Sequence, residues 1–139
     1  SVSKNPREYK SYLCIASLLL KEIAKQLETE YKGSFIFNKV SLSQKNSLKK
    51  QLEEILANLN LGMGYAPVTD DFHNKLGWCY SLLCLLEDDP SQALSYYNEG
   101  EKHLNVVKQV RPEIAEKNIN RLQCIGIQKN ICAKKISVA

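Results

Sequence analysis

The apolar residues of this chain recur at steps of three and four in five separate stretches, and this spacing predicts five amphipathic helices. The predicted helices cover residues 6–32, 43–60, 71–87, 90–109 and 112–135. The third stretch is apolar on nearly all sides, so we expect that helix at the centre of the fold. Short connections then predict one all-α domain, built as a five-helix antiparallel bundle or as stacked helical hairpins.

Residues that cap helices mark where these stretches begin. Asn5 and Pro6 open the first helix, and Asp89 and Pro90 open the fourth directly after a run of acids. Proline prevents a continuous helix, and the acids lie beside the positive end of the next helix dipole. We therefore interpret the break at residues 87–90 as a tight corner between two helices and not as a site.

Two connecting segments interrupt the helical pattern. Residues 34–44 are briefly β-like, but one apolar run without a partner strand cannot build a sheet, so we expect a connector that places Phe35 and Phe37 in the core. Residues 60–69 contain Gly62, Gly64 and Pro67, which predict the end of the second helix and a flexible link.

Charge is distributed unevenly along the 139 residues. The net charge is +4, yet residues 87–101 hold five acids and no Lys or Arg, whereas residues 102–139 hold eight basic residues and two acids. This pattern fits either a solvated charged face or an electropositive groove that attracts an acidic partner segment. The basic residues lack interleaved aromatic residues, which disfavours nucleic-acid binding. The longest apolar run, around Leu18, is too short to span a membrane.

The residues with reactive side chains form no recognisable catalytic or metal-binding pattern. The five cysteines are odd in number and lie in apolar helical stretches, which favours reduced thiols in an intracellular, reducing compartment, the cytoplasm or nucleus. Their spacing does not fit a zinc site. We expect His73 and His103 to be solvated. We therefore expect no catalytic residues, no metal, no cofactor and no enzymatic activity.

The fourth predicted helix carries small and aromatic residues at a recognisable spacing, Ala93, Leu94, Tyr97, Gly100 and Leu104. This pattern resembles the second helix of tetratricopeptide repeats and of MIT (microtubule interacting and trafficking) domains. The MIT resemblance covers residues 70–136, including a long, basic last helix. Gly77 and Cys84 stand where the repeats carry Trp and Tyr, and Glu101 stands where MIT domains carry an aliphatic residue.

The resemblance implies a non-catalytic module that holds an amphipathic, partly acidic peptide or helix of a partner protein in a groove between helices. Tyr97 would pack beneath the pocket. The candidate partner-binding residues are Leu104, Leu122 and Ile125 for the pocket, and Lys117, Arg121 and Lys129 for the partner's acids.

Two alternatives stay open. The chain is also similar to the C-terminal region of Unc-51-like autophagy kinases, which resembles two MIT domains in tandem, and this implies a regulatory or scaffold domain acting by self-association or intramolecular contact. Exposure of Ile15 and Leu18 on the outer side of the first helix would favour that alternative, as would a homo-dimer. Nucleic-acid binding through the basic C-terminal helix is the third possibility.

Overall fold

The computed structural model describes residues 8–131, which form five helices and a two-stranded β-hairpin. The elements are α1 (Glu8–Leu27), β1 (Glu28–Tyr31), β2 (Ser34–Phe37), α2 (Leu42–Met63), α3 (Asp70–Leu86), α4 (Pro90–Val110) and α5 (Pro112–Gln128). The all-α fold class predicted from the apolar spacing is confirmed. The proposed helix cap at Asn5 and Pro6 lies outside the described residues.

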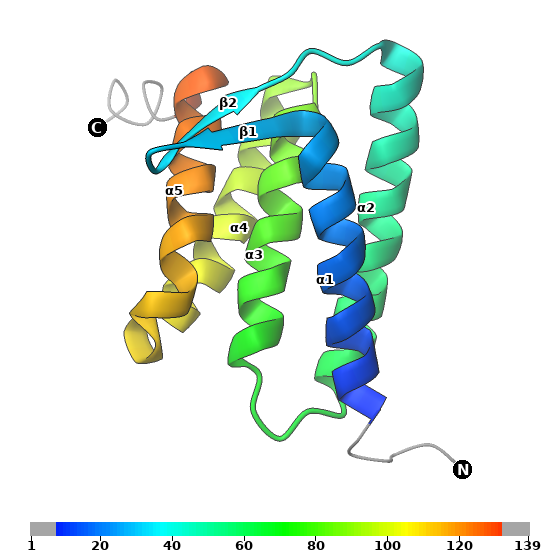
Figure 1. The fold of residues 1–139 in the computed structure, drawn as a ribbon, viewed down its shortest axis with the longest axis vertical. Helices are drawn as coiled ribbons and strands as arrows, with labels where there is room; N and C mark the ends of the chain where they lie inside the picture. Colours follow the sequence, from blue (N-terminus) through cyan, green and yellow to red (C-terminus); the bar gives the residue numbers. More distant parts are fainter. Residues whose placement is uncertain (1–7, 132–139) are drawn as a thin grey trace.

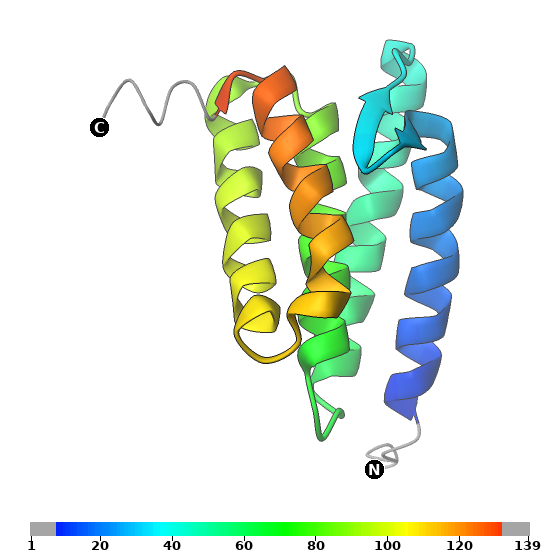
Figure 2. The same cartoon turned by 60° about the vertical axis from the view of Figure 1, so that its left-hand side comes forward.

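Helix α3 lies at the centre of the molecule, as its nearly continuous apolar surface predicts. The hairpin of α1 and α2 packs on one side of it and the hairpin of α4 and α5 on the other, so that α3 contacts all four (Figures 1 and 2). Leu76, Leu82 and Leu83 of α3 are completely buried. The fold therefore consists of two helical hairpins packed on opposite sides of one central helix.

Each side of α3 has its own core. The first core joins α1, α2 and α3 around Leu20, Leu52 and Phe72, and the second joins the end of α3 to α4 and α5 around Leu104 and Ile125. Because α4 lies very close to α3, a Cβ at position 77 would overlap the Leu104 side chain, so glycine is needed there. Each pair of outer helices therefore packs on α3 through its own set of buried apolar residues.

The segment between α1 and α2 differs from the prediction. Helix α1 ends at Leu27 and not at residue 32, and residues 28–31 pair antiparallel with residues 34–37, so the expectation of a connector without strands was wrong. Lys32 and Gly33 both have positive φ (51° and 79°), as a tight two-residue hairpin turn requires. Phe35 is buried as expected, and Phe37 packs against the second core.

Two helix ends also differ from the prediction. Helix α2 continues through Gly62, which packs against Tyr12 and Phe72 with no room for a Cβ, so this glycine permits close helix contact instead of ending the helix. Helix α5 ends at Gln128, and Asn130 adopts a positive φ of 62°. Asparagine tolerates this left-handed conformation, which interrupts the helix within the predicted range 112–135. Residues 132–135 lie outside the described part of the chain.

The corner between α3 and α4 is confirmed. A side-chain oxygen of Asp89 accepts a hydrogen bond from the backbone N–H of Gln92 at 3.1 Å, and Pro90 occupies the first turn of α4. Asp89 thus provides a hydrogen-bond acceptor for a free backbone N–H in the first turn of α4, as the sequence predicts, and Pro90 has no N–H that needs one.

Candidate protein-binding surfaces

A small hollow of about 150 Å³ lies between α4 and α5, where the sequence predicts a groove. Its lining residues are Tyr97, Glu101, Leu104, Asn105, Lys108, Ile119, Leu122 and Gln123. Leu104 and Leu122 are almost fully buried there, and Ile125 lies within the second core and does not line the hollow. The hollow is therefore shallow, with an apolar floor and a mostly polar rim.

Arg121, predicted to meet a partner's acids, is 2% exposed. Its Nε and Nη2 donate to the carboxylate of Glu28 at 2.7–3.0 Å, and its Nη1 donates to Asn118. The guanidinium lies 4.7 Å from the ring centres of both Phe35 and Trp78. The expectation that Arg121 faces a partner was wrong, because the β-hairpin brings Glu28 and Phe35 over α5.

The other two predicted basic residues have different surroundings. The Nζ of Lys129 donates to the backbone carbonyls of Leu85 and Glu87. Because α3 ends here, these carbonyls have no N–H partner within the helix. Lys117 lies on the surface, 3.3 Å from the carboxylate of Glu30. Of the three predicted cations, Lys129 thus caps α3, and Lys117 remains accessible to solvent beside an acid.

The acidic corner at residues 87–89 is balanced by α2. Lys49 contacts the carboxylate of Glu87 at 2.9 Å, and Lys45 contacts that of Asp88 at 2.8 Å. Burial raises the pKa of Glu87, but the hydrogen bonds from Lys49 and from the Asp89 backbone outweigh it and leave the pKa below its usual value. The hydrogen bond from Lys45 likewise lowers the pKa of Asp88. Two acids of the acidic run in the sequence, Glu87 and Asp88, are therefore paired with α2 within the molecule.

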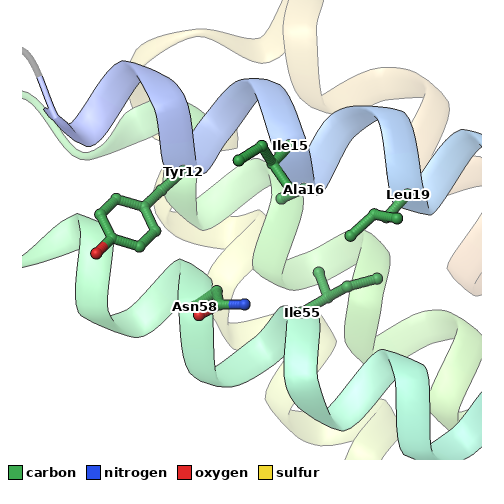
Figure 3. Close-up of a pocket in the computed structure, with 6 residues that line it drawn as sticks. All are labelled: Tyr12, Ile15, Ala16, Leu19, Ile55 and Asn58. Atoms are coloured by element: carbon green, nitrogen blue, oxygen red, sulfur yellow. The ribbon is translucent and has the colours of Figure 1, made fainter.

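A second hollow, of about 160 Å³, lies between α1 and α2 (Figure 3). Tyr12, Ile15, Ala16 and Leu19 line it from α1, and Ile55 and Asn58 line it from α2. Asn58 is the one strongly polar side chain in this lining. This hollow is consequently more apolar than the one between α4 and α5.

The α1–α2 hollow continues into an exposed apolar surface on α1. Ile15 is 55% exposed, Leu18 is 59% exposed and Leu19 is 44% exposed. Residues 11–20 contain no charged side chain. Because α1 buries only one face of this segment against α2 and α3, apolar side chains on the other face remain exposed. Contiguous exposed apolar residues mark interaction sites more often than isolated ones do.

The two histidines come together although the sequence predicted them to be solvated. Their Nδ1 atoms lie 2.9 Å apart, and the His103 ring stacks between His73 and Tyr80. Burial lowers the pKa of both imidazoles, and for His103 the neighbouring His73 lowers it further. One shared proton can make this hydrogen bond, so the pair links α3 to α4 when at least one imidazole is neutral. They lie thirty residues apart in sequence, and no local pattern could have paired them.

The cysteines within residues 8–131 are unpaired thiols, with Cys79 and Cys84 buried and Cys14 exposed. Burial raises the pKa of Cys79, and it raises that of Cys84 to about 12. Both core thiols are therefore protonated at neutral pH and are weak nucleophiles. In this part of the chain, no three His, Cys, Asp or Glu residues are placed to hold a metal ion.

None of the helices within residues 8–131 has the length and apolar character to cross a membrane. Comparison with known proteins found no matching family model, no matching curated protein and no matching solved structure. The resemblance to MIT and tetratricopeptide domains therefore stays a prediction.

Proposed function

We propose that this chain is a non-catalytic protein-interaction domain that binds an apolar helix of a partner along α1 and in the α1–α2 hollow. The observation that carries this proposal is the exposed, uncharged surface of Ile15, Leu18 and Leu19, which continues into an apolar hollow beside it. Burial of such side chains is the main driving force for association. An apolar helix lying in a groove between two helices is a common mode of peptide recognition.

The proposed contact has a defined arrangement. The partner's side chains would cover Ile15 and Leu18, and one of them would enter the hollow beside Leu19 and Ile55. Asn58 at the edge of the hollow offers one amide to hydrogen-bond the partner. The apolar contacts supply affinity, and this amide restricts the position of the bound helix.

The ion pairs between distant elements in the described part of the chain support a structural role for their charged side chains. Arg121 with Glu28 fixes the β-hairpin to α5, and Lys49 with Glu87 fixes α2 to the corner after α3. The buried thiols of Cys79 and Cys84 pack as small apolar side chains. The unpaired core thiols also support our placing of the domain in a reducing compartment of the cell.

The α4–α5 hollow is a second candidate surface. Tyr97, Leu104 and Leu122 form the floor that the sequence predicts, and Lys108 on its rim can meet an acid of a partner peptide. At this second surface Lys108 is the cation that meets the partner, because Arg121 and Lys129 form hydrogen bonds within the chain.

Quantitative pull-downs from cell extract can test both surfaces. The baits are the wild-type chain, Leu18→Glu for the α1 surface and Lys108→Glu for the α4–α5 hollow. Val106→Glu is a matched control, because Val106 is an exposed apolar residue of α4 and lines neither hollow. We expect specific partners to bind the wild type and the control but to be lost with Leu18→Glu.

Partners lost with Lys108→Glu instead would move the function to the α4–α5 hollow. Identical partner sets for all four folded proteins would refute both surfaces. Circular dichroism establishes that each variant is folded before its binding is compared.

A further inference from the structure

The exposed face of α1 has a regular order of side chains. Residues three and four apart form one stripe along it: Glu8, Ser11, Ile15, Leu18, Glu22 and Lys25. The apolar pair lies in the middle of the stripe, and the charged residues lie toward its ends. Such a three-and-four spacing is the pattern by which one helix packs along another helix.

We propose that the occupant of this face is a second copy of this chain, with the two α1 helices packed antiparallel across a two-fold axis between Ile15 and Leu18. This inference rests on the proposed function, because it names the partner that covers the α1 surface. In a two-fold contact the same patch is used by both copies, so the patch must be complementary to itself.

The order of charges on α1 provides that complementarity. In the antiparallel register Ile15 faces Leu18 of the second copy, and Glu8 faces Lys25 of the second copy, with each contact made twice. Within one chain Lys25 contacts Glu22 at 3.3 Å, but both side chains are largely exposed, and such a pair leaves Lys25 able to meet a further acid. A parallel arrangement would place Glu8 against Glu8 and Lys25 against Lys25, and like charges oppose association.

The stripe is also long enough for a contact between helices. From Glu8 to Lys25 it spans about 25 Å at about 1.5 Å per residue. Leu19 and Tyr12 flank it on the side of the α1–α2 hollow, so side chains of the second copy can reach the hollow as well. Because the apolar centre is short, we expect an equilibrium between monomer and dimer that depends on concentration.

Sedimentation equilibrium over a range of concentrations tests this inference. We expect the wild type to form dimers, Leu18→Glu to weaken the dimer at least about tenfold by placing two carboxylates at the apolar centre, and Val106→Glu to dimerise like the wild type. A dimer that survives Leu18→Glu, or one lost with Val106→Glu, would overturn the proposed contact.

Charge exchange tests the antiparallel register. Glu8→Lys or Lys25→Glu alone places like charges at both ends and should weaken the dimer several-fold. A mixture of the two variants should form mixed dimers in preference to either homo-dimer, because opposite charges then meet at both ends. Single-variant dimers as stable as the wild-type dimer would overturn the register, because in a parallel pairing like charges face each other in the wild type and in each single variant alike.

A wild-type chain that stays monomeric at every concentration would overturn the inference. If its pull-down partners still depend on Leu18, the α1 surface binds a different protein and the proposed function stands. If the partners do not depend on Leu18 either, the proposed function fails together with the inference.

Discussion

Replacing Arg121 by alanine should strongly destabilise this fold. The Arg121 side chain is 2% exposed and that of its partner Glu28 is 7% exposed, so the substitution leaves a carboxylate buried without its cation. Removing one partner of such a buried pair costs about 3–5 kcal/mol of unfolding free energy. The guanidinium also stacks on Phe35 and Trp78, and these contacts are lost as well.

The matched control is Lys117→Ala on the same helix. Lys117 and its partner Glu30 are 61% and 43% exposed, and an ion pair exposed to this degree contributes about 0–1 kcal/mol. Urea unfolding followed by circular dichroism measures both variants, and the fluorescence of Trp78, the single tryptophan, reports on the surroundings of Arg121. Equal losses for Arg121→Ala and Lys117→Ala, or a loss below about 1 kcal/mol for Arg121→Ala, would refute the reasoning.

A double-mutant cycle separates the ion pair from the packing of the Arg121 side chain. Arg121→Met keeps an apolar chain between the two rings, and Glu28→Gln removes the charge of the partner. If the buried charge is the cause of the loss, the double variant should be more stable than Arg121→Met alone. A double variant whose loss equals the sum of the single losses would assign the effect to packing.

Three further perturbations test other parts of the fold. Gly77→Ala should cost about 1–3 kcal/mol, because its new methyl group overlaps the buried Leu104 and the α3–α4 contact must widen. Asp89→Ala should cost about 1 kcal/mol by removing the side-chain cap of α4. Burial lowers the pKa of His73 and His103, so the unfolded chain binds more protons as the pH falls below about 6.5, and stability decreases there. His103→Phe keeps a stacked ring, removes one titrating group and should reduce this loss.

The measurements for these variants are urea unfolding at neutral pH and, for the histidines, at about pH 8 and about pH 5. Gly64→Ala is the control for Gly77→Ala, since a Cβ at position 64 meets its nearest neighbour at an ordinary 3.4 Å. Equal stability of these two alanine variants would contradict the close approach of α3 and α4. An unchanged pH dependence in His103→Phe would show that other groups control the acid sensitivity.

The helices and their order follow from sequence because their causes are local. Period, capping residues and proline positions act within one or two turns, so the corner at Asp89 and Pro90 and the central position of α3 were predictable. The exposed α1 surface is partly visible in the sequence, because residues 11–20 contain no charged side chain and one buried face cannot cover all of their apolar side chains. Ile15 and Leu18 are exposed in the structure, which is the observation that would favour the alternative of a self-associating or regulatory domain.

Tertiary structure alone decided which charged and polar side chains meet. Glu28 and Arg121 are 93 residues apart, and His73 and His103 are 30 apart, so no local spacing brings them together. The β-hairpin shows the same limit: Phe35 reads as part of a lone apolar run until residues 28–31 leave the helix and pair with it. Arg121 therefore looked like a surface cation in the sequence, because the carboxylate that buries it comes from a distant element whose position is set by packing around α3.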